Sequence, residues 1–228
     1  MTHSSDHIQT AELTWRDGAL PINTRFDDPY FSLNDGLAET RHVFLSGNHL
    51  PARFTDGFHI AELGFGTGLN MFTTLLEWRA AGMKTPLHFT SFEAFPMLAA
   101  DMDKALRAFP EVHEIAAPFL AEWANGKRHI QTGDLTADII IGDARETLPA
   151  WAGKADAWFL DGFSPAKNPE LWGDDLLQEV ANHTATNGTL ATYTAAGFVR
   201  RNLASAGFIV TRTTGFGRKR HMTTAKWP

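Results

Sequence analysis

The chain has 228 residues, of which 43% are hydrophobic, 26 are acidic and 20 are basic, and it contains no cysteine. This length suits one α/β domain, and the lack of cysteine excludes disulfides and thiolate metal sites, so we expect a reducing, cytoplasmic environment. No apolar run reaches the roughly 20 residues of a membrane-spanning helix, and the N-terminus lacks the regions of a secretory signal. The net charge of −6 disfavours a nonspecific nucleic-acid binder but allows a local basic patch.

Residues 1–57 differ in pattern from the remainder and predict an N-terminal extension that packs on a main domain. A hairpin with an Asp-Gly turn is expected first, because two short apolar segments flank that dipeptide. Its expected strands are 13–15 and 20–22, and its turn is at 17–18. A stretch rich in turn-forming residues follows, and a short helix is expected at 37–45.

From residue 58 to residue 228, segments of strand and helix pattern alternate, which predicts a mostly parallel, twisted sheet with helices on both faces. The expected strands are 58–64, 88–93, 137–142, 157–161, 189–194 and 208–213. The expected helices are 67–81, 97–109, 144–151, 171–183 and 198–206. A last apolar segment, 222–227, is expected to pair as an antiparallel edge strand.

A glycine loop stands between the first expected strand and the first expected helix of the main domain. Gly64, Gly66 and Gly68 allow a sharp bend and a close approach to a ligand, although a purely structural turn has the same pattern. The helix that follows offers free N–H groups to an anionic group. A dinucleotide motif has glycine or alanine at the position of Leu69, so the spacing favours a ligand without a diphosphate, such as S-adenosyl-L-methionine.

Four expected strands end in an acidic residue, and ligands of parallel sheets bind beyond these ends. Glu62 precedes the glycine loop, Glu93 suits hydrogen bonds from two ribose hydroxyls, and Asp143 suits an adenine amino group. Taken alone, Glu93 and Asp143 are equally explained as acids that stabilise a helix start, and Asp161 as the anchor of a turn. Their joint occurrence with a glycine loop favours a binding site.

The segment after the fourth strand, 158–172, combines Asp161 with an aromatic residue, two prolines and a lysine. Phe163 can stack on a flat base or a cation, and Lys167 with Asn168 can meet a phosphate or a base edge. The same composition also suits a crossover loop shaped by proline. The C-terminal region is rich in arginine and lysine, which predicts either a binding patch or a solvated face: Arg200, Arg201, Arg212, Arg218, Lys219 and Arg220.

Other catalytic motifs do not occur in the sequence. There is no H-E-x-x-H, no G-x-S-x-G and no G-x-x-x-x-G-K-[ST] segment, which disfavours zinc hydrolysis, a serine nucleophile and phosphoryl transfer. His3 and His7 have i, i+4 spacing but lie in the N-terminal tail, and we do not interpret them as a metal site.

The strand ends resemble those of class I S-adenosyl-L-methionine-dependent methyltransferases, which are Rossmann-like. More narrowly, six segments resemble the tRNA 5-aminomethyl-2-thiouridine methyltransferases: 27–50, 62–70, 92–96, 158–172, 192–208 and 215–222. Members of this family methylate the aminomethyl group of wobble uridine, either alone (MnmD-type) or as the N-terminal half of bifunctional MnmC enzymes. Because the sequence ends at Pro228, we expect it to lack the flavin-dependent activity of the bifunctional members.

The resemblance implies a role for each residue that matches a family motif. The implied cofactor-binding residues are Glu62, Gly64, Gly66, Thr67, Gly68, Glu93, Asp143 and Ala144. Among them, the glycine loop would hold the methionine part, Glu93 the ribose, and Asp143 with Ala144 the adenine. Asp161 would be the catalytic acceptor, and Tyr30 with Phe31 would help to close the site.

The implied partner is the anticodon loop of tRNA, and no metal ion is required. The implied substrate-binding residues are Tyr30, Phe163, Lys167, Arg200, Arg201, Arg218, Lys219 and Arg220. A separate flavin-dependent oxidoreductase that acts on the precursor is a candidate partner. Three other functions stay open: methylation of a small amine or a protein side chain, noncatalytic binding of S-adenosyl-L-methionine or RNA, and, disfavoured by Leu69, a nicotinamide oxidoreductase.

Overall fold

The structure is a computed structural model that describes residues 9–32 and 35–228; His3 and His7, and positions 33–34 of the segment 27–50, lie outside this range. An eight-stranded sheet of order β10-β11-β9-β8-β4-β5-β7-β6 forms its centre. Its strands are β4 (His59–Leu63), β5 (Leu87–Glu93), β6 (His129–Thr132), β7 (Leu135–Ile141), β8 (Ala155–Leu160), β9 (Thr184–Thr192), β10 (Ile209–Thr214) and β11 (His221–Lys226). This arrangement confirms the predicted α/β architecture.

The five central strands β9, β8, β4, β5 and β7 are parallel, as the alternating pattern predicts. β11 is antiparallel to both of its neighbours, which confirms the direction expected for the last apolar segment. Its expected place at the edge is wrong, because β10 and β11 form a hairpin whose second strand enters between β9 and β10. The outermost strands of the sheet are therefore β10 on one side and the antiparallel strand β6 on the other.

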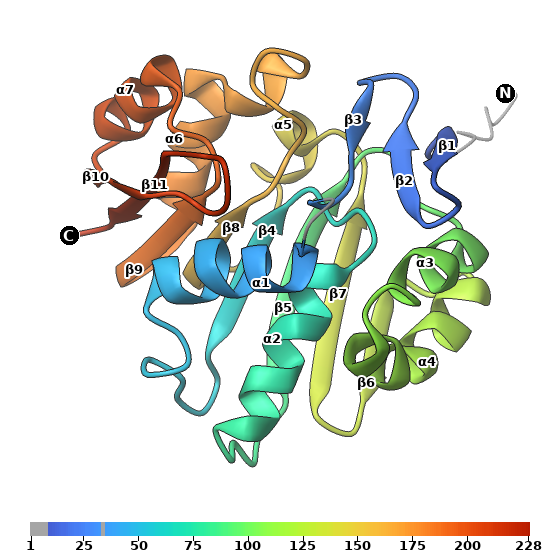
Figure 1. Ribbon diagram of the computed structural model, residues 1–228. Coiled ribbons are helices and arrows are strands. Elements are labelled where there is room, and N and C mark those ends of the chain that lie inside the picture. Colours follow the sequence, from blue (N-terminus) through green and yellow to red (C-terminus); the bar gives the residue numbers. More distant parts are fainter. Residues whose placement is uncertain (1–8, 33–34) are drawn as a thin grey trace, which may run out of the picture.

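Helices cover both faces of the sheet (Figure 1). They are α1 (Gly36–Thr40), α2 (Leu69–Ala80), α3 (Ala99–Leu106), α4 (Pro110–Ala124), α5 (Ala144–Thr147), α6 (Asp174–Asn182) and α7 (Gly197–Ser205), with the short turns η1 (Arg41–Leu45), η2 (Ser46–Asn48) and η3 (Pro169–Trp172). None of these helices is long and apolar enough to cross a bilayer, within the residues that are described.

Successive side chains of each strand point to opposite faces of the sheet, and two apolar clusters form, one on each face. Ile60 and Phe89 lie in a cluster with α2, α3 and α4, whereas Leu63 and Trp158 lie in a cluster with α5, α6 and α7. The expected elements did not include α4 and β6. Pro118 stands inside α4 and interrupts a helical pattern, and β6 has only four residues, two of them exposed, so neither gives a strong signal in the sequence.

The N-terminal segment forms a small antiparallel sheet of β1 (Leu13–Arg16), β2 (Leu20–Asn23) and β3 (Asp28–Pro29), which Figure 1 shows beside α3. Asp17 and Gly18 have φ angles of +52° and +73°, as the tight turn of a hairpin requires. The predicted hairpin is thus confirmed, and the helix expected at 37–45 is α1 continued by the wider turn η1.

The segment after this small sheet is part of the main core. The ring of Phe44 in η1 is 3% exposed and lies 5.3 Å from the ring of Phe159 in β8. The buried amide of Asn48 donates to the carbonyls of Phe44 and Trp158 and accepts a 2.5 Å hydrogen bond from Thr189. These contacts hold α1 and η1 against the sheet at a fixed position.

We predict that Phe44→Ala lowers the free energy of unfolding by about 3–5 kcal/mol, because it removes a buried ring between η1 and β8. The matched control is Phe198→Ala on α7, where the side chain is 37% exposed and a change of about 0.5 kcal/mol is expected. Urea unfolding followed by circular dichroism measures both. Equal losses in the two variants would show that the N-terminal segment contributes little to the core.

Candidate active site

The acidic strand ends predicted from the sequence lie together along the edge of the sheet that the carboxyl ends of the parallel strands form. Hydrogen bonds between neighbouring strand ends connect them: the N–H of Gly64 donates to the carbonyl of Phe92 at 2.9 Å, and the N–H of Asp161 donates to the carbonyl of Leu63 at 3.0 Å. In the next pair, the N–H of Gly142 donates to the carbonyl of Glu93. The carboxyl ends of β4, β5, β7 and β8 therefore meet side by side, as a parallel sheet requires.

The glycine loop at 64–68 follows β4 and leads into α2. Gly64, Gly66 and Gly68 have φ angles of +90°, +53° and +77°, which residues with a Cβ atom rarely adopt. A Cβ atom on Gly64 would collide with the carbonyl of Asp161, and one on Gly66 would lie 2.9 Å from the ring of Tyr30. The loop is thus held close to the end of β8 and to the N-terminal segment, and only glycine fits these positions.

Glu93 lies directly beneath this loop. Its carboxylate accepts hydrogen bonds from the N–H groups of Gly66 at 2.9 Å and Phe95 at 2.8 Å. Burial raises the pKa of Glu93, and these backbone donors act in the opposite direction. The alternative role of Glu93 as a helix cap does not apply, because α3 begins at Ala99 after an N-cap at Leu98.

Asp143 has the capping role that the sequence left open. It is the N-cap of α5, where it accepts a hydrogen bond from the backbone N–H of Arg145. It also forms an ion pair of 2.5 Å with the guanidinium of Arg145. The hydrogen bonds from Arg145 lower the pKa of Asp143. Ala144, which follows it, is buried at the start of the helix.

Two carboxylates of the site are joined through one amide. Asn70, in the first turn of α2, donates to Glu62 at 2.9 Å and to Asp161 at 2.7 Å, and its oxygen accepts from the hydroxyl of Thr40 at 2.8 Å. Ser91 donates to the second oxygen of Glu62 at 2.8 Å. Glu62 is fully enclosed, so it reaches the site only through Asn70.

Asp161 is the half-buried member of this network. Burial raises its pKa to about 7, a shift that the hydrogen bond from Asn70 opposes, while Glu39 raises the pKa and Lys219 lowers it. Burial also raises the pKa of Glu62 well above its usual range. Asp161 consequently changes its charge near neutral pH, which suits a group that accepts and releases a proton.

Aromatic side chains of the N-terminal segment cover the loop after β8. Phe26 stacks on Phe163 with ring centroids 4.7 Å apart, and the ring of Tyr30 meets Phe163 edge-on at 5.2 Å. Tyr30 accepts a hydrogen bond from Asn23, and burial raises its pKa. The ring of Phe31, expected to help Tyr30, packs instead edge-on against Phe109.

Lys167 ties the same loop to the N-terminal segment. Its ammonium contacts the carbonyl oxygen of Asp27 and lies 3.7 Å from the carboxylate of Asp28. Asp28 also accepts a hydrogen bond from the N–H of Ser164 at 2.9 Å. Phe163 and Lys167, both expected to bind substrate, are thus engaged with residues 26–30 in this structure.

Sequence reasoning missed four side chains near Asp161: Thr40, Asn70, Glu39 and Tyr193. The hydroxyl of Tyr193, just after β9, donates to the carbonyl of Gly162 at 2.8 Å. Asn70 and Tyr193 stand inside segments that carry the family resemblance, so that pattern was the available signal. Thr40 and Glu39 also stand inside such a segment, 27–50, but they belong to α1, and nothing local in the sequence places this helix next to the end of β8.

Five of the predicted basic residues fall into two groups that follow the carboxyl ends of strands, whereas Arg212 lies within β10. Arg200 and Arg201 lie in α7, which follows the carboxyl end of β9. Residues 218–220 lie in the exposed turn between β10 and β11. Since β10 runs parallel to β9, this turn also follows a carboxyl end, and Lys219 reaches the ring of Tyr193. Arg200 donates from Nε to the carbonyl of Ala195.

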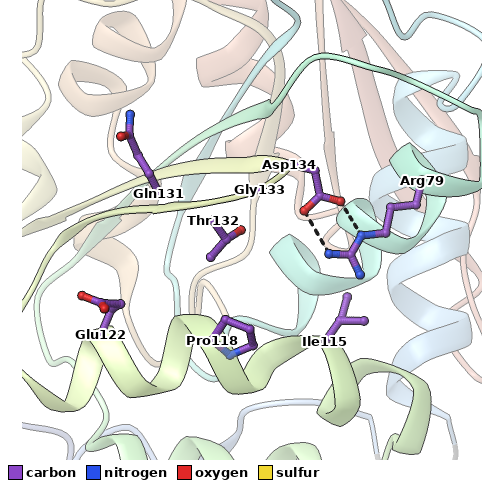
Figure 2. Close-up of a pocket in the computed structure, with 8 residues that line it drawn as sticks. All are labelled: Arg79, Ile115, Pro118, Glu122, Gln131, Thr132, Gly133 and Asp134. Atoms are coloured by element: carbon purple, nitrogen blue, oxygen red, sulfur yellow. Dashed lines mark hydrogen bonds and ion pairs between the residues drawn. The ribbon is translucent and has the colours of Figure 1, made fainter.

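A cavity of about 410 Å³ lies away from this edge, between α4 and the turn that joins β6 to β7 (Figure 2). Figure 2 shows the guanidinium of Arg79 paired with Asp134, above Ile115. Asp134 precedes β7, so the cavity is at the amino end of that strand, and none of the predicted site residues lines it. Among the described residues, no group of three or more His, Asp or Glu side chains could hold a metal ion.

Comparison with known proteins gives consistent matches. A family model described as S-adenosyl-L-methionine-dependent methyltransferase matches residues 110–228. The chain is 42% identical over 225 residues to the tRNA 5-methylaminomethyl-2-thiouridine biosynthesis bifunctional protein MnmC of Leptospira borgpetersenii, covering 94% of this chain and 34% of that protein. The protein of the same name from Aeromonas salmonicida is 41% identical over 233 residues, with 95% and 35% covered.

Among solved structures, the crystal structure of MNMC2 from Aquifex aeolicus matches with a TM-score of 0.76 and 30% identity, covering 96% of this chain and 72% of that one. The chain spans about a third of the length of the bifunctional relatives it matches.

We predict that the carboxyl of Asp161 titrates near pH 7 and that Asn70→Ala moves its pKa higher, because the variant removes a donor that stabilises the ionised form. Carbon-13 NMR of labelled aspartate measures this directly. Asn202→Ala is the matched control, since Asn202 donates to the distant carbonyl of Trp172. A pKa of Asp161 near 3.8 in the wild type would contradict the assignment. So would a pKa that shifts equally in Asn70→Ala and Asn202→Ala.

Proposed function

Since the chain belongs to the S-adenosyl-L-methionine-dependent methyltransferase family, we propose that it methylates the 5-aminomethyl group of wobble (2-thio)uridine in tRNA, giving 5-methylaminomethyl-2-thiouridine. The names of its sequence relatives, which refer to the biosynthesis of this nucleoside, support the choice of substrate. The observation that carries the chemistry is Asp161, a half-buried carboxyl at the carboxyl edge of the sheet with a pKa of about 7.

The residues of this edge fit the cofactor. The glycine loop leaves space where a Cβ atom would clash, and the loop and Glu93 are joined by a hydrogen bond from Gly66. We assign the methionine part to the loop with Thr67, the ribose to Glu93, and the adenine to Asp143 and Ala144. Glu62 supports the site through Asn70, because both of its oxygens are already bonded. Bound S-adenosyl-L-methionine supplies an activated methyl group, and the transfer uses neither a metal ion nor a flavin.

Asp161 is assigned the role of binding the ammonium of the substrate and accepting its proton. An aliphatic ammonium has an unperturbed pKa of about 10.4, so presenting the free amine at pH 7 costs roughly 4.6 kcal/mol. A carboxyl that titrates near 7 is a stronger proton acceptor than one at the usual value of 3.8. Asn70 holds Oδ2 of Asp161 by its hydrogen bond, which fixes the orientation of the carboxylate.

The aromatic cover completes the proposed acceptor site. Phe26, Tyr30 and Phe163 pack together beside the glycine loop and exclude water from this region. A drier environment disfavours the charged amine and so lowers its pKa, which assists the proton transfer to Asp161. Alignment of the amine with the methyl group supplies further acceleration.

For the RNA, we propose that exposed basic side chains around the mouth of the site contact phosphates of the anticodon loop. Arg200, Arg201, Arg218, Lys219 and Arg220 follow the carboxyl ends of β9 and β10, at the same edge as Asp161. A local patch of this kind allows a chain with a net charge of −6 to bind RNA. The wobble base is single-stranded and can turn into a pocket. A cytoplasmic location and a separate oxidoreductase acting on the precursor stay predictions.

We predict that Asp161→Asn lowers kcat/KM for methylation of tRNA bearing the aminomethyl uridine by about 10²–10⁴-fold, the usual contribution of a general base. In the wild type, kcat/KM rises about tenfold per pH unit up to pH 7 and then levels, because only the ionised carboxylate accepts a proton. Nucleoside mass spectrometry with labelled cofactor measures the product. Isothermal calorimetry serves as the control, with cofactor affinity nearly unchanged in the variant.

Two results would contradict this role. Equal losses of cofactor affinity and turnover in Asp161→Asn would mean that the residue supports the fold of the site only. Methyl transfer to small amines or proteins, with none to the modified tRNA, would move the acceptor to another class.

We predict that reversing the charge of Arg218 and Arg220 together, as Arg218→Glu with Arg220→Glu, raises KM for tRNA at least tenfold at physiological salt. The dependence of log KM on log salt also becomes shallower by about 0.7 for each lost phosphate contact. Lys84→Glu, in the exposed turn before β5 at the opposite edge, is the control. If KM and its salt dependence match those of the control, the turn between β10 and β11 does not bind RNA.

A further inference from the structure

Lys219 brings a primary ammonium group to the edge of the sheet where Asp161 lies. Its Nζ atom is 2.9 Å from Oε1 of Glu39 and 4.2 Å from the centroid of the Tyr193 ring. The side chain of Glu39 is only 14% exposed, whereas that of Lys219 is 48% exposed. A nearly enclosed carboxylate and an aromatic face therefore hold a cation that comes from an exposed turn.

The surroundings of this cation are strongly acidic. Burial raises the pKa of Tyr193 well above its usual range, and the carboxylates of Asp161, Asp28 and Glu39 raise it further. The hydroxyl of Tyr193 donates to the carbonyl of the residue that follows Asp161. The three carboxylates thus come from three separate segments and lie within electrostatic reach of one ring.

We propose that Glu39 and the face of Tyr193, beside Asp161, form the subsite in which the protonated amine of the substrate is first held before Asp161 accepts its proton, and that Lys219 fills this subsite until a substrate amine replaces it. The inference rests on the proposed methylation of an aminomethyl group. It adds two specificity residues, Glu39 and Tyr193, and a displaceable internal cation. A protonated primary amine on an alkyl carbon has the same chemistry as the end of a lysine side chain.

An empty subsite of this kind is electrostatically unfavourable. Glu39 is nearly enclosed and Asp161 is half-buried, so their negative charges are poorly screened and repel each other when no cation is nearby. The face of an aromatic ring attracts a cation through its quadrupole, and it attracts a neutral group of the same size much less. The subsite consequently selects an ammonium over a neutral substituent.

The position of Lys219 also links the amine to the RNA. Lys219 stands between Arg218 and Arg220 in the turn that joins β10 to β11, and all three are exposed. An ammonium that leaves Glu39 enters a basic surface and can pair with a phosphate. Entry of the modified base and closer contact with the anticodon loop would then occur together, whereas a base without the amino group leaves Lys219 in place.

A small cation tests the subsite without RNA. We expect millimolar propylammonium to raise the thermal unfolding midpoint of Lys219→Ala by more than that of Lys226→Ala, because only the first variant has a vacated site for it. Lys226 is the matched control, since it is exposed at the far end of β11. The neutral analogue 1-propanol is expected to affect both variants equally. Adding Glu39→Gln to Lys219→Ala removes the extra response.

Equal responses of Lys219→Ala and Lys226→Ala to propylammonium would overturn the inference. The measurement involves neither tRNA nor methyl transfer, so its failure is distinct from failure of the proposed function. A response confined to Lys219→Ala, in a protein that does not methylate tRNA, would support the amine subsite and reject the RNA substrate.

A pair of tRNAs provides the second test. We compare the Kd of one tRNA with and without the aminomethyl group on its wobble uridine, and take the ratio, in which the phosphate contacts common to both tRNAs cancel. We expect Lys219→Ala to increase this preference for the amine several-fold, and Glu39→Gln and Tyr193→Leu to reduce it toward one. Lys226→Ala keeps the wild-type ratio. A ratio that stays unchanged in Lys219→Ala and Glu39→Gln would overturn the proposal.

Discussion

The site depends on a single amide that donates to two carboxylates. β4 and β8 are neighbours in the sheet, so their carboxyl ends bring Glu62 and Asp161 together. Two neighbouring carboxylates repel each other when both are ionised. Asn70 provides one N–H to each of them, and Thr40 fixes the orientation of the amide by donating to its oxygen. The first turn of α2 therefore holds the glycine loop, the enclosed acid and the proposed base in one rigid arrangement.

This arrangement is unfavourable for stability, and the remainder of the fold offsets it. Burial raises the pKa of Asp161 to about 7, which means that the folded protein disfavours the ionised form that a base must have. The stability that protonated Asp161 contributes is present at low pH and is lost as the pH rises through 7. Two apolar clusters, one on each face of the sheet, supply the stabilisation that tolerates such a group.

The sequence allowed prediction of the parts of the site that depend on strand ends. The spacing of Gly64 and Gly66 indicated the loop, and the acids Glu93 and Asp161 followed strand patterns, because parallel strands place their carboxyl ends at one edge. Contacts between distant segments were not predictable. Glu39 meets Lys219 only because α1 is held on the sheet by Asn48 and because the last hairpin inserts β11 beside β9. These positions follow from tertiary packing.

The separation of charge explains how an acidic chain could bind the proposed RNA substrate, which carries a cationic group. The carboxylates of Asp161, which is half-buried, and Glu39, which is nearly enclosed, stand where the proposed ammonium would bind. Positive side chains such as Arg218 and Arg220 are exposed in a turn at the rim, where phosphates would be. Lys219 connects the two regions, because its stem is at the rim and its ammonium is inside. The net charge of −6 is therefore a poor guide to the partner, since the distribution of charge along the sheet edge decides which group enters and which stays outside.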